Sequence, residues 1–300
     1  MTMRFTKPAA LLGASVLAVL VLSGCERGVL NPVGPIGAAE RTILFDSLVI
    51  MLAIVIPVII ATLWVAYRFR ASNTRAPYWP TFTNSGRLEL IIWSIPVLVI
   101  FFLGGLAWTS SFLLDPARPL ASRSRPLEVE VVSLDWKWLF IYPGQHMASL
   151  NRLVVPTGVP LRLRLTSASV WNVFWVPQLG TMIYCMHGMA DTLYLQADHP
   201  GVYQGASAMI SGDGFADMHF DTVAMPAAEF ANWVSAAKAS GPVLDDTAYR
   251  ALLRQSSNVP PQTYRSVRQG LFESIVMQQL PPGEGPQQDA PGPAVALVER

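Results

Sequence analysis

The sequence predicts an α+β membrane protein in which a two-helix transmembrane hairpin precedes an all-β sandwich and a short α-helical extension. Residues 47–67 and 90–114 carry no charge, and each run is long enough to cross the hydrocarbon core of a bilayer. Leucine and arginine then alternate over 161–165, which is typical of a half-buried strand. From about residue 227 the apolar residues recur at helical spacing.

The composition agrees with a membrane protein and argues against several other classes. Of 300 residues, 52% are hydrophobic and only 14% are charged, below the share of about 25% in soluble domains. The net charge of +1 gives no reason to expect nucleic acid as a partner. The sequence contains no Walker loop and no G-x-G-x-x-G, H-E-x-x-H or G-x-S-x-G motif. Cys25 and Cys185 lie too far apart for a C-x-x-C redox or metal motif.

Residues 1–24 are expected to be an export signal of the lipoprotein type. Arg4 and Lys7 precede the uncharged stretch "PAALLGASVLAVLVLSG", which fits the apolar core of a signal peptide. It ends in "LSGC", and small residues before a cysteine resemble the box at which bacterial lipoproteins are cleaved and acylated. We therefore expect Cys25 to carry fatty acids such as palmitate and to begin the mature chain. The alternative is an ordinary transmembrane helix that ends by chance in a cysteine.

Residues 25–114 are expected to hold the acylated N-terminus and two spans, at about 44–67 and 89–112. The loop between the spans contains several arginines and no acidic residue. Such an excess marks the cytoplasmic side of a bacterial inner membrane, so both outer flanks of the hairpin are then periplasmic. The arginines are Arg68, Arg70, Arg75 and Arg87.

Residues 126–226 are expected to form the periplasmic β domain, after a polar linker at 115–126. Several short strand-like stretches with turn signals between them favour a sandwich or a small barrel. Residues 227–280 contain short amphipathic stretches and are expected to form a helical C-terminal extension. Residues 281–300 are rich in proline and glycine and are expected to be a disordered tail.

The stretch "GASAMISGDGFADM", residues 205–218, has the spacing of a copper-binding loop without most of its ligands. If Ser207 and Ser211 were cysteines and Phe215 were histidine, the pattern would be C-x3-C-x3-H-x2-M. Thiolate, imidazole and thioether groups are soft donors suited to copper. Of that pattern only Met218 remains.

This loop, together with "DWKWLF" and "SVWNVFWVPQLG", resembles subunit II of the haem–copper respiratory oxidases. The resemblance extends from the signal to about residue 239 and implies that the β domain is cupredoxin-like. In that family two histidines, two cysteines, a methionine and a backbone carbonyl bind the binuclear copper A centre. The matching positions of this chain, in sequence order, are Asn172, Ser207, Met209, Ser211, Phe215 and Met218.

The loss of ligands matches the quinol-oxidising branch of the family, the cytochrome o type ubiquinol oxidases. Serine hydroxyls are hard and protonated, so they do not replace the bridging thiolates. The resemblance therefore implies that this chain binds no metal and that haems and copper belong to subunit I. It implies a structural subunit of a proton-pumping complex that oxidises ubiquinol and reduces oxygen to water. The implied partners are subunits I, III and IV and membrane lipid. Neither cytochrome c nor nucleic acid is an expected partner.

A second class of function stays open, a membrane-anchored lipoprotein of cupredoxin fold that assists oxidase assembly or holds copper transiently. The stretch "GTMIYCMHGMAD" is the one that favours it, because its side chains are copper-compatible donors. On a strand Cys185 and His187 would share a face, but two ligands do not close a site. We expect the whole group to be structural: Met182, Cys185, Met186, His187 and Met189.

Glu89 opens the second span in "RLELIIW" and is a candidate proton-entry residue. An ionisable group at a membrane boundary is a functional candidate by default. In the family a glutamate at this place lies near the mouth of a proton path into subunit I. The alternative is an interfacial acid that only ends the helix.

Trp136 and Trp138 of "DWKWLF" match an aromatic cluster that accepts electrons from cytochrome c in the copper-bearing relatives. Without copper behind them, we expect both indoles to serve packing.

Overall fold

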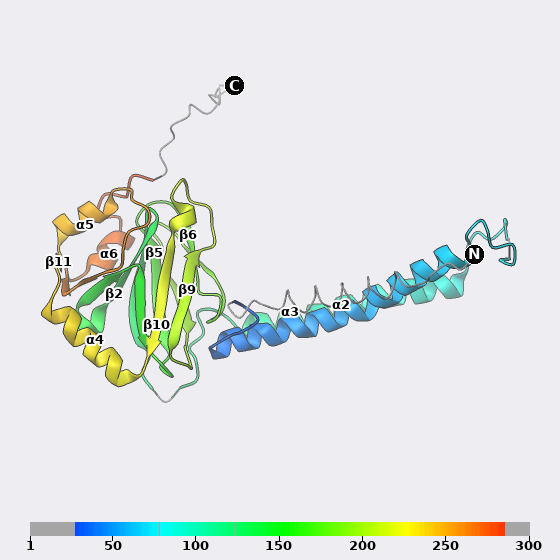
Figure 1. Cartoon of the computed structure of the whole chain (residues 1–300), viewed down its shortest axis with the longest axis horizontal. Helices are drawn as coiled ribbons and strands as arrows, with labels where there is room; N and C mark the ends of the chain where they lie inside the picture. Colours follow the sequence, from blue (N-terminus) through cyan, green and yellow to red (C-terminus); the bar gives the residue numbers. More distant parts are fainter. Residues whose placement is uncertain (1–27, 78, 123, 286–300) are drawn as a thin grey trace, which may run out of the picture.

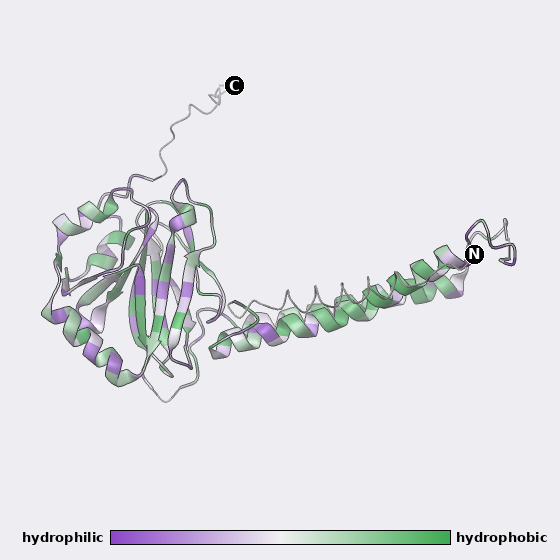
Figure 2. Cartoon of the chain, in the orientation of Figure 1, coloured by the Kyte–Doolittle hydropathy of each residue, from purple (hydrophilic) through white to green (hydrophobic). Residues whose placement is uncertain are grey.

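The computed structural model describes residues 28–77, 79–122 and 124–285. It begins with two helices, α2 (Pro35–Arg68) and α3 (Gly86–Leu113), which project from a β-rich domain (Figure 1). Both are long and apolar enough to cross a membrane, and Figure 2 shows them hydrophobic over most of their length. The two helices contain the predicted spans, so the prediction of an apolar helical hairpin is confirmed. The signal peptide and Cys25 lie outside the described residues.

Helix α2 is longer than the predicted span, and the extra length lies on the side of the β domain. At about 1.5 Å per residue its 34 residues measure about 51 Å, whereas the hydrocarbon core is about 30 Å thick. The apolar run begins only after Asp46. The turns between Pro35 and Asp46 therefore continue the helix outside the core, toward the domain.

Residues 28–37, which we call the entry segment, connect this helix to the β domain. The Val33 N–H donates a hydrogen bond to the Gln178 carbonyl oxygen at 2.8 Å. A Cβ atom on Gly34 would lie 2.0 Å from the carbonyl oxygen of Gln196, so only glycine permits this close approach. The start of α2 is therefore held directly against the domain.

Two packed sheets form the β domain, as the sequence predicts. The first has the strand order β12-β3-β2-β1-β5-β8 and the second has the order β4-β10-β9-β6-β7. Most neighbouring strands are antiparallel, but β1 pairs with β5 and β4 pairs with β10 in parallel. The strands of the first sheet before the extension are β1 (Leu127–Leu134), β2 (Lys137–Tyr142), β3 (Met147–Leu150), β5 (Leu161–Ser167) and β8 (Asp191–Leu195). Those of the second are β4 (Arg152–Pro156), β6 (Asn172–Trp175), β7 (Ile183–Cys185), β9 (Gly201–Ser207) and β10 (His219–Met225).

The main core lies between the sheets, and β5 shows how the sequence builds it. Leu161, Leu163 and Leu165 are fully buried, while Arg162 and Arg164 lie on the other face and are only partly buried. The predicted alternation is therefore present, because successive side chains of a strand point to opposite faces. Each fully buried leucine contributes about 1.5–3 kcal/mol of hydrophobic stabilisation.

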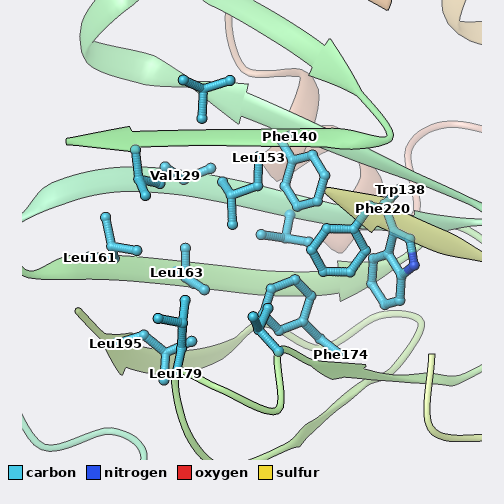
Figure 3. Close-up of a cluster of buried hydrophobic side chains, with 14 of the residues drawn as sticks. Val129, Trp138, Phe140, Leu153, Leu161, Leu163, Phe174, Leu179, Leu195 and Phe220 are labelled. Atoms are coloured by element: carbon cyan, nitrogen blue, oxygen red, sulfur yellow. The ribbon is translucent and has the colours of Figure 1, made fainter. Parts of the chain in front are cut away.

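Aromatic side chains fill one end of this core (Figure 3). Trp138 of β2 lies edge-to-face with Phe174 of β6, with ring centroids 5.5 Å apart. Phe174 stacks on Phe220 of β10 at 5.2 Å. These contacts join both sheets next to the stretch that resembles a copper loop. Trp138 is fully buried, which agrees with the packing role expected for it.

The C-terminal extension is not purely helical: α4 packs against the main core, and the elements after it cover the outer face of the first sheet. Strand β12 pairs with β3 and extends that sheet, while β11 pairs with β13. The sequence predicted helices alone, because strands of two or three residues are too short to show a period. The elements are α4 (Ala227–Ala239), β11 (Val243–Leu244), α5 (Asp246–Leu253), β12 (Gln262–Tyr264), β13 (Ser266–Val267) and α6 (Leu271–Val276).

This covering gives β1 and β2 a second core on their outer side. Val132 and Leu139 belong to one buried cluster with Tyr249 of α5 and Phe272 of α6. Strand β2 and the second half of β1 are therefore buried on both faces, which explains the apolar run from Trp138 to Tyr142.

The first residues of the predicted tail are hydrogen-bonded to the domain. The Gly283 N–H donates to the Ala168 carbonyl oxygen at 2.9 Å, and the Gly285 N–H donates to the Asp135 carboxylate at 2.9 Å. The tail boundary predicted at residue 281 thus falls inside the ordered fold, while residues 286–300 lie outside the described residues.

Candidate functional site

The loop that resembles a copper site connects β9 to β10 and contains the short 3-10 helix η2 (Phe215–Asp217). Strand β9 pairs with β6 so that Ser207 lies opposite Phe174. Asn172 begins β6, two residues earlier, and therefore lies beside the start of the loop. The structure thus brings together Asn172, Ser207 and Met209, as the resemblance implies.

Asn172 and Ser207 form a buried hydrogen-bond network at positions where the family resemblance implies metal ligands. The Ser207 hydroxyl lies 3.0 Å from Asn172 Oδ1 and 3.2 Å from the Met209 carbonyl oxygen, and donates its one proton to either acceptor. Asn172 Nδ2 donates to Ser133 Oγ at 2.7 Å. Asn172 and Ser207 are both buried, so these hydrogen bonds offset the cost of removing their polar groups from water.

Trp136 holds the middle of the loop from the turn between β1 and β2. Its indole Nε1 donates to the Ser211 carbonyl oxygen at 3.3 Å. Its ring lies so close to Gly214 that a Cβ atom there would be 2.4 Å from the ring. Trp136 also has a positive φ of 62°, a backbone conformation that is costly for a large residue. Trp136 is therefore a loop-holding residue, a role that the sequence did not indicate.

The remaining three positions have structural surroundings of different kinds. The Ser211 hydroxyl is buried and has no hydrogen-bond partner among the described residues. Met218 is buried in the main core, and its carbonyl oxygen accepts the Ser207 N–H at 3.2 Å. Phe215 is half-buried at the start of η2. None of the three provides a thiolate or an imidazole.

The donors in this loop do not fit copper A. Across the part of the chain that the structure describes, no three His, Cys, Asp or Glu side chains gather in a way that could hold a metal ion. The hydroxyl and amide groups at the ligand positions are hard, neutral donors, and Asn172 and Ser207 already bond to each other. The arrangement can fix the loop on β6 and β9 without a metal, and it offers no relay for electrons.

The second group of copper-compatible side chains does not converge on one point. Cys185 is fully buried in the main core, and burial raises the pKa of its thiol. His187 Nδ1 lies 3.1 Å from the Ser167 carbonyl oxygen. Met182 and Met189 are each about half exposed. A structural role for this group stays a prediction.

Glu89 lies in the first turn of α3, and this helix begins at the end of the hairpin away from the β domain (Figure 1). Its side chain is exposed, and the carboxylate makes no hydrogen bond or ion pair with any other residue that the structure describes. A carboxylate in the first turn is favoured by the helix dipole, which is enough to explain its place at a helix start.

Sequence reasoning missed two buried charges on the turn between β1 and β2. Lys137 is 1% exposed, and its Nζ donates to the Arg254 carbonyl oxygen at 2.7 Å and to Ser256 Oγ at 2.6 Å. Asp135 is 3% exposed and accepts the Ser169 hydroxyl and the Gly285 N–H. Burial lowers the pKa of Lys137 to about 8, although nearby carboxylates oppose that shift.

Trp136 thus holds the β9–β10 loop, while Asp135 and Lys137 on either side of it hold residues at and beyond the end of the C-terminal extension's helix α5 and near residue 285. The available sequence signal was the pair of charged residues at alternate places in the apolar stretch "SLDWKWLF". Charged residues are almost never fully buried unless they are paired, so their place in such a stretch indicates specific partners.

Two family models match consecutive parts of this fold. The model described as "Cytochrome C oxidase subunit II, periplasmic domain" matches residues 131–225, which hold most of the sandwich. The model described as "COX Aromatic Rich Motif" matches residues 238–283, which hold most of the C-terminal extension.

Similar proteins cover nearly the whole chain. "Cytochrome bo(3) ubiquinol oxidase subunit 2" of Pseudomonas aeruginosa is 43% identical over 268 residues, 89% of this chain and 81% of the relative. "Ubiquinol oxidase subunit 2" of Acetobacter aceti is 45% identical over 261 residues, 86% of this chain and 85% of the relative. Among solved structures, the periplasmic domain of subunit II of cytochrome oxidase of Bradyrhizobium japonicum covers 40% of this chain and 98% of that domain, with 24% identity and a TM-score of 0.37.

Proposed function

The chain belongs to the subunit 2 family of ubiquinol oxidases, and we propose that it is the copper-free structural subunit of a complex that oxidises ubiquinol and reduces oxygen. The observation that carries this proposal is the hydrogen-bond network of Asn172, Ser207 and Met209. The loop is held on β6 and β9 by hydrogen bonds among the residues at the copper-ligand positions that the resemblance implies. The relatives named above give no support to the alternative role in assembly or copper handling.

In this proposal the chain takes no part in electron transfer. Haems and copper belong to the partner subunits, which ubiquinol reaches from the membrane. The contribution of this chain is mechanical: two helices packed against membrane-embedded partners, and a β domain that caps them on the periplasmic side. The arginine-rich loop between the helices and the excess length of α2 on the domain side support this orientation in a bacterial inner membrane.

A copper-loading experiment on the full chain in detergent tests the absence of a relay. After addition of copper(II) and a reductant, we expect no purple mixed-valence absorption, because thiolate and imidazole ligands are missing. Stoichiometric copper with a seven-line paramagnetic signal would overturn the proposal. Co-purification of the chain with a haem-rich, multi-span subunit separates an oxidase subunit from an assembly lipoprotein.

We propose a lipid at Cys25 as a second attachment to the membrane. The lipoprotein box in the sequence supports it, as does the position of Gly28, which already lies against the β domain. Mass spectrometry of the mature N-terminus is the test, and an unmodified Cys25 or a chain that begins at Met1 contradicts it. Cys25→Ala is expected to leave the complex assembled, because two spanning helices anchor the chain far more firmly than acyl chains do.

We propose further that Glu89 collects protons for the complex, whose turnover moves protons across the membrane. Its exposure and its lack of a described partner support this role, since a free carboxylate at the cytoplasmic end of α3 can exchange protons with water. The family resemblance at "RLELIIW" is the second support.

A further inference from the structure

The outer face of the first sheet carries a polar pocket of about 480 Å³ at the end where β1 and β5 begin. Its side chains come from three neighbouring strands, the loop after β2 and the linker before β1. None of the described residues that line it belongs to the C-terminal extension, which covers the same face farther along β5, where α6 is hydrogen-bonded to that strand. The polar residues of the lining are Arg125, Glu128, Gln145, Arg162 and Tyr194.

We propose that this pocket binds the headgroup of a phospholipid that carries a primary amine, such as phosphatidylethanolamine. The guanidinium groups of Arg125 and Arg162 hold the phosphate, while the Glu128 carboxylate and the Gln145 side-chain carbonyl hold the ammonium group. The lipid belongs to the leaflet next to the β domain. In the orientation proposed above, on which this detail rests, that is the periplasmic leaflet.

The connection to α3 places the pocket at the membrane surface. The uncharged run of α3 ends at Leu114, and Pro116 follows two residues later. Two residues span at most about 7 Å, which is similar to the thickness of one headgroup layer. The Pro116 carbonyl oxygen accepts the Tyr194 N–H at 2.9 Å. Tyr194, which lines the pocket, therefore lies at the level of the headgroups, where tyrosine is enriched in membrane proteins.

The side chains of the pocket lie on one face of the sheet. In the strand register Glu128 of β1 is opposite Arg162 of β5, and Arg162 is opposite Tyr194 of β8. Residues that are directly opposite each other in neighbouring strands point to the same side. One small ligand can therefore contact all three.

The pocket has spare donors for a phosphate. Arg162 Nη1 donates to the Glu128 carboxylate at 2.7 Å, which uses only part of the five N–H donors of the guanidinium group. Arg162 Nε has no hydrogen-bond partner among the described residues. The side chain as a whole is 40% exposed, so the guanidinium group can turn toward an acceptor in the pocket. Arg125 is exposed and forms no ion pair in the described structure. Guanidinium groups bind phosphate oxygens through charge-assisted hydrogen bonds, often two at once.

An unpartnered acceptor in the same pocket favours an amine. Gln145 Oε1 is buried and accepts no hydrogen bond from the residues that the structure describes. A phosphodiester has no proton to donate to it, whereas a primary ammonium group has three N–H donors. The Glu128 carboxylate lines the same pocket and balances the positive charge of the amine. A choline headgroup carries no N–H and cannot satisfy Gln145.

Hydrogen exchange of the full chain in nanodiscs tests the site. Discs of phosphatidylcholine are compared with discs that also contain phosphatidylethanolamine. We expect slower amide exchange at residues 125–128 and 143–146 only when phosphatidylethanolamine is present. Arg125→Gln and Arg162→Gln should each need about tenfold more of this lipid for the same protection, which corresponds to the loss of one charge-assisted hydrogen bond. Arg152→Gln, at an exposed arginine of β4 in the other sheet, is the matched control and should behave as the wild type.

A further variant separates the two halves of the headgroup. Gln145→Leu removes the acceptor for the amine but keeps both arginines, so it should protect the two segments equally with either lipid. Because Arg125 is exposed, its replacement removes no buried contact, and a lost response in Arg125→Gln is not a loss of folding.

Three results overturn the proposal. The first is equal protection of the wild type by both lipids. The second is equal protection by inorganic phosphate added to phosphatidylcholine discs, since the ligand is then a soluble anion. The third is protection in the assembled complex that does not depend on the lipid, because another subunit then covers the pocket. None of these measurements depends on copper, so failure here leaves the copper-free role intact.

Discussion

The side chains of Asn172 and Ser207 are hydrogen-bonded to each other across strands β6 and β9, with Ser207 Oγ 3.0 Å from Asn172 Oδ1. By resemblance, these are the positions of a histidine and a cysteine in copper-bearing relatives. The contact joins the same two strands that a metal would join. The hydrogen bond therefore holds the start of the β9–β10 loop on β6 without a metal.

Removal of either partner should destabilise the domain, and removal of both should cost less than the sum. Ser207→Ala leaves Asn172 Oδ1 without its donor, which costs about 1–3 kcal/mol of unfolding free energy. Asn172→Ala is expected to cost more, because Ser133 also loses its partner and a cavity remains. The double mutant should fall short of additivity by about 1 kcal/mol.

Thermal unfolding of the full chain in detergent measures these differences. Ser235→Ala on exposed α4 is the control and should change stability by less than about 0.5 kcal/mol. Strict additivity of the Asn172 and Ser207 substitutions would show that their contact contributes nothing.

Restoration of copper binding should require all four lost ligands together. The combined variant Asn172→His, Ser207→Cys, Ser211→Cys and Phe215→His keeps Met218 and the Met209 carbonyl in place. We expect it to take up copper and to turn purple, because it supplies the two thiolates and two imidazoles that the wild-type loop lacks. The variant without Ser211→Cys should not do so, and optical absorption after copper loading distinguishes the two. A purple three-substitution variant would contradict the expectation that both thiolates are needed.

Lys137 should make stability depend on pH in the alkaline range. Burial lowers its folded-state pKa to about 8, whereas an unfolded lysine titrates near 10.4. Between these values the unfolded state binds more protons, so the unfolding free energy rises with pH there, by about 1–3 kcal/mol in total. Below pH 8 the cost of burying the charge is constant, and the hydrogen bonds to Arg254 and Ser256 offset it.

Lys137→Met should remove this alkaline rise and loosen the C-terminal extension at every pH. Lys238→Met is the matched control, since Lys238 is exposed in the last turn of α4. Chemical unfolding at pH 7 to 10.5 gives the slopes. A rise of equal size in Lys137→Met and in the wild type would assign the pH dependence to other groups.

Glu89 should affect turnover without affecting assembly. Glu89→Gln keeps the shape and loses the titration, so we expect a partial loss of ubiquinol-dependent oxygen uptake per haem, and the same for Glu89→Ala. Glu89→Asp should recover part of the activity if proton exchange is what matters. Asp115→Asn, just beyond the opposite end of α3, serves as the control. Equal rates in all variants would leave Glu89 as an acid that only favours the helix start.

The elements that the sequence revealed are those whose pattern is local. The uncharged runs gave both helices, and the alternation of Leu161, Arg162 and Leu163 gave a strand of the sandwich with the correct face inward. Strand β12 has three residues and pairs with β3, which lies more than a hundred residues earlier in the chain. The local pattern of apolar residues cannot predict such a long-range pairing.

The candidate site divides in the same way. The family resemblance grouped Asn172, Ser207 and Met209, but the hydrogen bonds among them depend on the register of β6 and β9, which the sequence does not state. The contacts of Trp136 with the loop and of Lys137 with Arg254 join residues 75 and 117 positions apart. Their partners could not be predicted because tertiary packing alone brings them within reach.

The unbroken course of α2 from the membrane into the entry segment has a mechanical consequence. A helix turns by about 100° per residue. The number of residues in α2 therefore sets both the distance of the β domain from the bilayer and its rotation about the helix axis. The direction in which the β domain faces, about the axis of α2, thus depends on how many residues lie between the membrane and the domain. One residue inserted between Pro35 and Asp46 would lift the domain by only about 1.5 Å but would swing it through roughly a quarter of a circle, whereas seven residues would return it nearly to its original bearing.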